Sequence, residues 1–342
     1  MAFAQGSRSR LSYAVQTASG GTPAFKNPNT TGSEFTVLPF STHSLNMAKE
    51  RVAGSDIQSH RMPTVDRHGA RSVAGDIVAD LRHAEYDTLI ESALMSGTTF
   101  GTGFTAGDGV TTVTNAAILG TTPKFLTIED YAEDITQVRT FDGCAVNTMA
   151  VSLAPNQMAT ATFGIVGRQM GLSQSPKSSV SASAGNEPFD SYSGDIFVAD
   201  VGTDAGDILN NPTASTIITG LDFTLDNGFA PTMVIGETTA SDLEFGTASL
   251  EGTITAYFED LSLINRFISE TESGLSVSIG DPSGRTLSFT FPRIKINSAD
   301  VGVDGPTSRI VNLSFVGLRD DTDLSSSTTD ANTLIKVVKS EA

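Results

Sequence analysis

The chain of 342 residues carries 39 acidic and 21 basic side chains, which gives a formal net charge of -18. This balance excludes a protein that grips nucleic acid by neutralising phosphates, because such binding needs clustered Lys and Arg. A single cysteine, Cys144, excludes an intrachain disulfide. No run approaches the roughly 20 apolar residues of a membrane helix, and the polar N-terminus has no signal-peptide core. We therefore expect a protein that is made in the cytoplasm and not exported by an ordinary signal.

Residues 1–34 are predicted to form an N-terminal arm, because Gly, Pro and polar residues interrupt every period. Arg8, Arg10 and Tyr13 stand out within this segment of an acidic chain. Two interpretations have equal weight at this point. The segment is either a frayed terminus or an arm that docks on a neighbouring subunit.

The first structural half is predicted to span residues 35–170. It opens with a strand from Glu34 to Met47, and a long polar link then leads to residue 71. The Gly- and Thr-rich stretch from Gly97 to Pro123 is typical of a flexible hairpin or loop. Farther on, two alternating strands flank the turn at residues 154–156.

Residues 171–215 are rich in Ser and Gly, so we expect a linker or insertion there, with a strand at Asp195–Asp200. The second half is predicted to span residues 216–318, and its first strand alternates apolar and polar residues from Leu221 to Asp226. Residues 319–342 are expected to form an acidic, mobile tail.

One pattern occurs twice. Ser72–Ser92 and Ser249–Ser269 each begin with the strict alternation of a half-buried strand and then switch to helical spacing. The few helix formers and the abundance of Thr, Ser, Val, Ile and Phe also favour strands. The sequence therefore predicts a mainly β fold of two duplicated halves, β-sandwich or split-barrel in type, each with one short α-helix.

No constellation of residues indicates catalysis. The histidines, His43, His60, His68 and His83, lack the spacing of a metal site, and Cys144 within a predicted strand is typical of a small core residue. The chain has no nucleophile elbow, and its glycine-rich stretch is not a phosphate-binding loop. We predict no catalytic residue, no cofactor, no metal and no enzymatic activity.

The most informative feature is where the acidic residues lie. Asp76, Asp80, Asp222, Asp226 and Glu251 all occupy the polar side of predicted strands whose other side is apolar. One interpretation is that outward positions are polar in any β-sandwich. The sharper one is a sheet face that meets a polyanion and must not bind it.

The sequence resembles the major tail tube proteins of bacteriophages with long, non-contractile tails (siphophages). The resemblance depends on a series of short motifs from about residue 8 to residue 318: Arg8–Tyr13, Arg67–Ile77, Phe141–Met149, Ala154–Asn156, Gly252–Asp260, Thr271–Gly274 and Phe289–Arg293. Residues 171–215 and the segment after residue 318 carry no matching motif.

This resemblance implies a virion structural protein, assembled in the host cytoplasm, that forms stacked hexameric rings. Each subunit is expected to give strands to an inner β-barrel that closes on hexamerisation. The five acidic residues then become lumen-facing candidates, in a channel that conducts double-stranded DNA during ejection without binding it tightly. Arg8, Arg10 and Tyr13 become candidates for contacts between rings, as do the 48–71 link and the 97–123 loop. The implied partners are further copies of the chain, a tape-measure protein and tail terminator and tip proteins, with no membrane.

Two other functions remain open at this stage. A β-sandwich binding module, such as a capsid-decorating or adhesin-like virion protein, predicts a stable monomer or trimer with affinity for a surface or a sugar. A hydrolase on a β scaffold is the poorest candidate, because no nucleophile and base are paired.

Overall fold

The computed structural model describes residues 3–56, 59–60, 62, 64–106, 109–177, 179–200, 218–259, 261–302, 308–320 and 332–340. The fold is mainly β, as predicted, and the two α-helices of these residues are α1 (Asp87–Ala93) and α3 (Ser262–Ile268). The strands of the first half are β1 (Ser9–Val15), β2 (Thr36–Val37), β3 (Thr42–His43), β4 (Asn46–Ala53), β5 (Asp66–Asp80), β6 (Phe104–Thr105), β7 (Thr112–Val113), β8 (Ala116–Ile118), β9 (Leu126–Ala132), β10 (Gln137–Leu153), β11 (Thr160–Gly167) and β12 (Gln169–Ser173). The strands that follow are β13 (Asp190–Asp200), β14 (Ile218–Asp226), β15 (Ala230–Thr232), β16 (Asp242–Glu244), β17 (Ser249–Tyr257), β18 (Ser273–Gly280), β19 (Thr286–Val301), β20 (Ile310–Leu318) and β21 (Lys336–Ser340).

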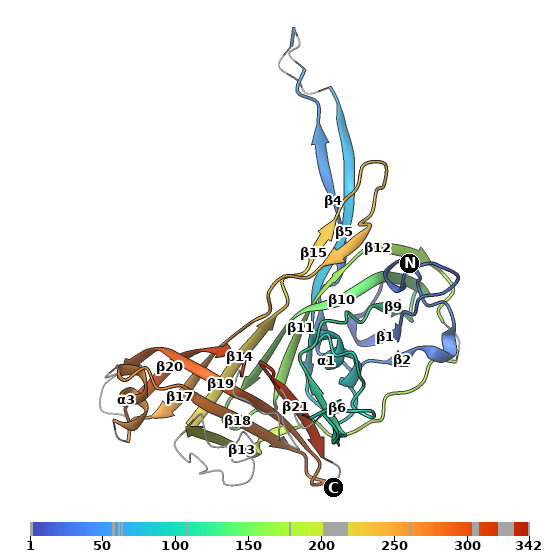
Figure 1. The fold of residues 1–342 in the computed structure, drawn as a ribbon. Helices are drawn as coiled ribbons and strands as arrows, with labels where there is room; N and C mark the ends of the chain where they lie inside the picture. Colours follow the sequence, from blue (N-terminus) through green and yellow to red (C-terminus); the bar gives the residue numbers. More distant parts are fainter. Residues whose placement is uncertain are drawn as a thin grey trace.

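A long antiparallel sheet runs through both halves of the molecule (Figure 1). Its strands follow the order β4–β5–β11–β10–β14–β17–β20–β19, and β3 continues the β4 edge beside β5. The pairing of β10 with β14 joins the two halves, with Val151 opposite Phe223. The two halves are therefore parts of one continuous sheet.

Alternating side chains explain why this sheet has one buried face. On β14, Leu221, Phe223 and Leu225 are buried, whereas the residues between them point outward. The Phe223 ring lies 5.2 Å from the ring of Phe289 and 4.9 Å from that of Phe291, both from the second layer. Burying such rings stabilises the fold by roughly 1.5–3 kcal/mol each relative to exposure.

Two strands bend from the long sheet into a second layer. The first part of β10 pairs with β9 and β12, and β9 also pairs with β1. The first part of β19 pairs with β18, which in turn pairs with β13. The bend of β10 lies at Gly143, whose φ of +63° favours glycine and where a Cβ would come within 2.9 Å of the Phe25 carbonyl oxygen.

The structure confirms that the two halves repeat one topology. β5, α1, β9, β10 and β11 correspond in order and pairing to β17, α3, β18, β19 and β20. The irregularities in the strand pairing also correspond. One lies at Asn147 in β10 and at Asn297 in β19. The other lies between Phe141 and Cys144 in β10 and between Phe291 and Ile294 in β19. Each pair of positions differs by 150, so the repeat extends to individual residues.

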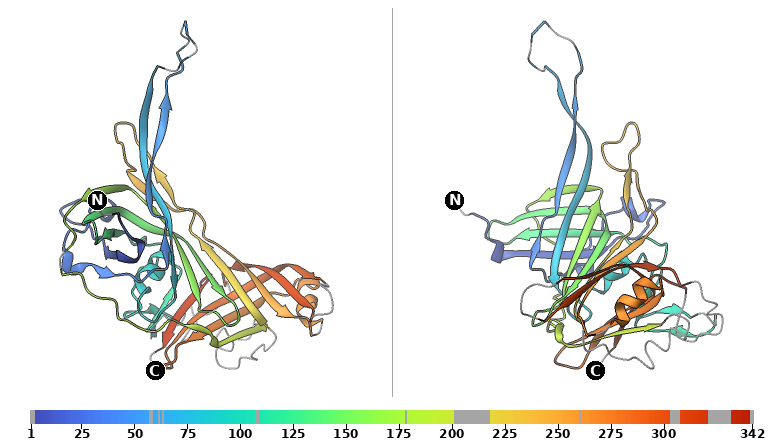
Figure 2. Two further views of the ribbon diagram at one scale, coloured as in Figure 1. Left: turned by 180° about the vertical axis from the view of Figure 1, so that it is seen from behind. Right: turned by 90° about the vertical axis from the view of Figure 1, so that its left-hand side faces the viewer.

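Two hairpins project from the same end of the sheet, as Figures 1 and 2 show. The longer one is formed by β4 and β5, and the shorter by β15 and β16. Both hairpins precede the helix of their repeat. The longer hairpin ends in β5, which leads to α1, and the shorter one is followed by β17, which leads to α3. A backbone hydrogen bond from Arg71 N to Thr238 O joins the two hairpins.

Several boundaries differ from those predicted. The strand expected from Glu34 to Met47 is divided among β2, β3 and the start of β4, and the link expected over residues 48–71 is the β4–β5 hairpin. In the stretch from 97 to 123, the structure has the short strands β6, β7 and β8, and β6 pairs with β7 as a hairpin. The strand expected at Asp195–Asp200 is confirmed within β13.

The predictions of an N-terminal arm and of a mobile C-terminal tail are partly wrong, because both segments contain strands. Residues 9–15 form β1, which is paired along its whole length with β9. Residues 336–340 form β21, which pairs with β19 and β8, and Lys339 Nζ lies 2.5 Å from Asp87 Oδ2 at the start of α1. Residues 178 and 201–215 of the predicted linker and residues 321–331 and 341–342 of the predicted tail lie outside the described residues. Both chain ends thus contribute strands to the folded subunit.

Candidate functional site

The five predicted acidic residues lie on one face of the long sheet. The strand registers place Asp76, Gly164, Thr148 and Asp226 in one row across four strands. Another row contains Asp80, Thr160, Ser152 and Asp222. Residues of one row, and of alternate rows, point to the same side of a sheet.

Glu251 completes a cluster at the centre of this face. It lies opposite Thr224, so it is diagonal to both Asp222 and Asp226. Diagonal neighbours in an antiparallel pair are about 7–8 Å apart, which is close to the Debye length of about 8 Å at physiological salt. These three carboxylates therefore present a local negative potential without strong mutual repulsion.

No basic residue interrupts this face. In the paired stretches 72–80, 147–153, 160–167, 218–226, 249–257 and 310–318, these five acidic residues are the only charged ones. Lys295 of β19 lies in the row of Glu251, two strands away and beyond β20, and its Nζ lies 2.9 Å from Glu270 Oε2. We call this surface, built by the polar sides of these paired stretches of β5, β11, β10, β14, β17 and β20, the acidic face.

Small polar residues fill the space between the carboxylates. Ser152 donates a hydrogen bond to Asp222, and the Gly228 amide donates one of 2.8 Å to Asp226 Oδ1. At Gly164, a Cβ would come within 2.2 Å of Thr148 Oγ1, so a larger residue would displace its neighbour. The acidic face is therefore lined by short side chains and lacks long cationic ones.

The structure places the three arm candidates differently from one another. Arg8 closes a short 3₁₀ turn at the N-terminus, before β1. Arg10 lies within β1, with its Nη2 atom 3.3 Å from Oε1 of the fully buried Glu129. Tyr13 is buried inside the subunit. Arg10 and Tyr13 thus serve the fold of their own subunit, and we no longer regard them as contacts to another ring.

The long hairpin carries a charge pattern that the sequence analysis did not identify. Residues 46–71 contain five basic and three acidic side chains, although the whole chain is strongly acidic. Lys49, Arg51, Arg67 and Arg71 belong to its two strands, and Arg51 Nε lies 2.9 Å from Asp66 Oδ2. The signal in the sequence was this local reversal of charge within an acidic protein.

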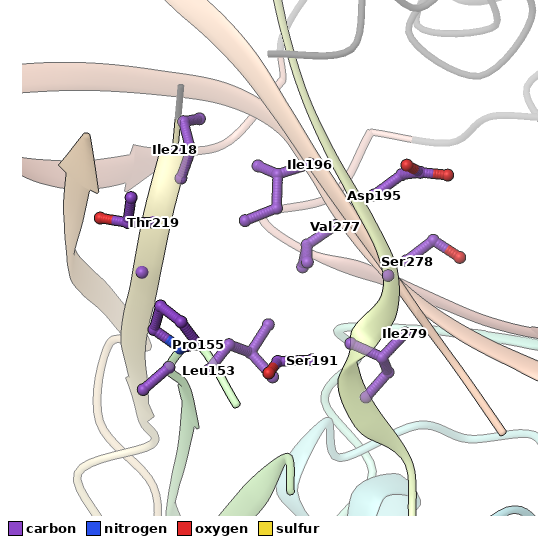
Figure 3. Close-up of a pocket in the computed structure, with 13 residues that line it drawn as sticks. Leu153, Pro155, Ser191, Asp195, Ile196, Ile218, Thr219, Val277, Ser278 and Ile279 are labelled. Atoms are coloured by element: carbon purple, nitrogen blue, oxygen red, sulfur yellow. The ribbon is translucent and has the colours of Figure 1, made fainter. Parts of the chain in front are cut away.

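An apolar pocket of about 420 Å³ opens between the two layers of the second half (Figure 3). Ile218 and Thr219 lie on one side of it, and Ile196, Val277 and Ile279 lie on the other. Among the described residues that line the pocket, Asp195 is the only charged one. This lining provides packing surface but no pair of groups for acid–base chemistry.

Three residues of β9 and β10 in the second layer have shifted pKa values. Burial raises the pKa of Asp130, but hydrogen bonds from His43 and Arg139 outweigh it and hold that pKa below its usual range. Burial raises the pKa of Asp142 despite its hydrogen bond from Gln169. Burial likewise raises the pKa of the Cys144 thiol, which is fully enclosed and therefore unsuited to nucleophilic attack.

The described residues contain neither a metal site nor a membrane-spanning helix. Within the described parts of the chain, no three His, Cys, Asp or Glu residues are placed to hold a metal ion. No helix in those parts has the length and hydropathy required to span a membrane.

Comparison with known proteins supports the resemblance noted from the motifs. A family model described as phage tail tube protein matches residues 6–317, which covers both repeats and the acidic face. A search of curated proteins found no match. The family is a structural one, in agreement with the prediction that the chain is not an enzyme. The chain belongs to the phage tail tube protein family, whose members assemble into the tube of the virion tail.

Proposed function

We propose that this chain forms stacked rings in which the acidic face lines the lumen and conducts DNA during ejection. One observation carries the proposal: where these six adjoining strands pair, over residues 72–80, 147–153, 160–167, 218–226, 249–257 and 310–318, the acidic face combines five carboxylates with no basic residue. The opposite face of the same sheet is buried against the second layer, so the acidic face is the one that the described parts of the chain leave exposed.

The chemistry of this surface suits a conduit. DNA carries about one negative charge per 1.7 Å of its axis, and basic contacts gain affinity by releasing its counterions. A lumen lined by Lys or Arg would retain the duplex, whereas carboxylates and short polar side chains do not hold it. Because the field is screened over about 8 Å, the acidic residues act only on DNA that approaches the wall. The lining therefore keeps the duplex mobile.

The family resemblance implies a hexameric ring of six subunits, whereas the two repeats within this chain favour three chains that together supply six repeats. Arg8 and the two hairpins at one end are proposed to contact the adjacent ring. The β4–β5 hairpin extends far from the body of the subunit (Figures 1 and 2), and its basic residues suit an acidic partner surface. The proposed partners besides the chain itself are a tape-measure protein inside the growing tube and terminator and tip proteins at its ends, with assembly in the host cytoplasm.

Negative-stain microscopy of the purified protein tests this function directly. We expect rings or tubes with a central channel. A stable monomer or trimer that never polymerises and instead binds capsids or glycans would contradict the proposal and support a virion binding module.

A further inference from the structure

The long sheet ends in two edges that no described strand covers. At one end, residues 295–301 of β19 pair only with β20, and at the other, β3 and the first residues of β4 pair only with β5. Because neighbouring strands alternate in direction along the sheet, these two edges are antiparallel to each other. Exposed edges of this kind are templates for pairing with another chain.

The junction between the two repeats shows how such edges can pair. Within one chain, β14 lies between β10 of the first repeat and β17 of the second. The equivalent of β10 is β19, and the equivalent of β17 is β5. If two copies join as the two repeats do, the counterpart of β14 should lie between β19 of one copy and β5 of the other. In the first repeat this counterpart is residues 42–47, which pair with β5.

The registers support this equivalence residue by residue. His43 lies opposite Ile77, and Leu221 lies opposite Ile254, its counterpart in the second repeat. Met47 and Leu225 likewise lie opposite the equivalent residues Val73 and Leu250. At Gly75, a Cβ would come within 2.7 Å of the Leu45 backbone, which places Leu45 where Phe223 lies opposite Gly252.

We propose that β19 of one copy pairs antiparallel with residues 42–47 of a second copy, in the register of the internal β10–β14 junction. In that register, Met149 faces Leu225 and Val151 faces Phe223. The corresponding contacts between copies place Ala299 opposite Met47, Asp300 opposite Asn46 and Val301 opposite Leu45. This inference rests on the proposed function, because it specifies how the subunits of a ring join.

Burial at the two edges agrees with the proposal. At the internal junction, Met149, Val151 and Leu225 are almost fully buried. Their counterparts Ala299, Val301 and Met47 also pack against the core, but each remains only half-buried. Pairing with a second copy would enclose these three side chains and would satisfy the free backbone groups of both strands.

The junction also determines how many copies form a ring. Each chain supplies two repeats and about eight strands, so three chains supply six repeats and roughly 24 strands. With strands about 4.8 Å apart and tilted by about 40°, such a barrel has a backbone diameter of about 48 Å. Six chains would double this to about 95 Å, wide enough for several duplexes side by side. A channel for one duplex therefore favours three chains, whose six repeats provide the sixfold arrangement.

Cysteine cross-linking tests the register and the number of chains together. Asn46 and Asp300 are both exposed, and Cys144 is buried and can be retained. In purified tubes of the double variant Asn46→Cys/Asp300→Cys, we expect oxidation to link neighbouring chains, because directly opposite Cβ atoms lie about 4.5–5.5 Å apart. On a non-reducing gel, the ladder should end at three chains. The control Glu50→Cys/Asp300→Cys is displaced by four residues and should link at least tenfold less.

The possible outcomes are distinct. Tubes that cross-link efficiently in the control but not in the matched pair would overturn the register, while leaving the tail tube function intact. A ladder that continues to six chains would overturn the count. Failure of the unmodified protein to form any ring or tube would instead refute the proposed function. If the cysteine variants fail to fold, hydrogen exchange of the unmodified protein tests the pairing itself. Those amides of residues 295–301 that point away from β20 should gain protection of at least tenfold on polymerisation, and unchanged exchange would overturn the proposed pairing.

Discussion

Reversing the charge of the three central carboxylates of the acidic face should slow the passage of DNA through the tube. In the triple variant Asp222→Lys, Asp226→Lys and Glu251→Lys, each chain gains about six positive charge units on the acidic face. All three positions are outward on paired strands, so the fold should tolerate long side chains there. If only three of the new lysines in a ring contact phosphates at one time, affinity for DNA should depend on salt with a slope of about -2.7 on logarithmic axes. This slope corresponds to a change of about 40-fold between 50 and 200 mM salt.

The assay follows DNA release from triggered particles with a fluorescent dye at several salt concentrations. We expect the triple variant to form normal tails but to eject at least tenfold more slowly at 50 mM salt, with recovery at 200 mM. Two controls separate causes: the neutral variant D222N/D226N/E251Q removes charge without adding lysine, and Glu34→Lys/Glu133→Lys/Glu187→Lys reverses exposed charges elsewhere. Both should eject within about twofold of the unmodified particle. Ejection by the triple lysine variant at the normal rate at every salt concentration would refute the assignment of the acidic face to the lumen.

Three further predictions concern the hairpin and the second layer. Replacing residues 50–70 with Asn-Gly should leave the melting temperature of the subunit within a few degrees while abolishing tubes in electron micrographs, and normal tubes would show that the long hairpin does not join rings. Arg10→Ala should destabilise the subunit by about 3–5 kcal/mol in urea unfolding, because it leaves the buried Glu129 carboxylate without its cation. An unchanged urea midpoint would contradict this and would favour the contact between rings that the sequence predicted for Arg10. Asp142→Asn should raise stability by about 1 kcal/mol at pH 7, since burial raises the pKa of Asp142 and so penalises its charged form. The raised folded-state pKa means that this penalty is present at neutral pH and fades as pH falls, so the gain should vanish below about pH 4, and a gain that persists there would contradict the cause given.

The strands that the sequence predicted well are those with one buried and one exposed face. Alternation from Leu221 to Asp226 corresponds to β14, and the repeated pattern at residues 72 and 249 corresponds to β5 and β17. The turn at residues 154–156 also follows from its residue types, and Asn156 has a φ of +59°. The acidic residues were correctly assigned to outward positions for the same reason.

The elements that the sequence missed lack this alternation. In β1, four consecutive residues from Leu11 to Ala14 are buried, so both faces are covered and no period of two appears. In β4, nearly every residue after Met47 is exposed, and the strand depends on backbone pairing with β5. Neither pattern differs locally from that of an irregular segment, so an arm and a link were predicted where strands occur.

The assembly of the acidic face depends on contacts between distant residues. Asp76 and Asp226 occupy one row only because β11 and β10 lie between β5 and β14. No local period indicates which strands become neighbours. The resemblance to tail tube proteins supplied that arrangement in outline, whereas the registers established it residue by residue.

A cryo-EM map of the polymerised protein is the most direct test of the central claim. The account predicts a tube with an open bore whose wall carries Asp76, Asp80, Asp222, Asp226 and Glu251 on a continuous β-barrel. A map without a central channel, or one in which these carboxylates face outward and Lys or Arg line the bore, would contradict it.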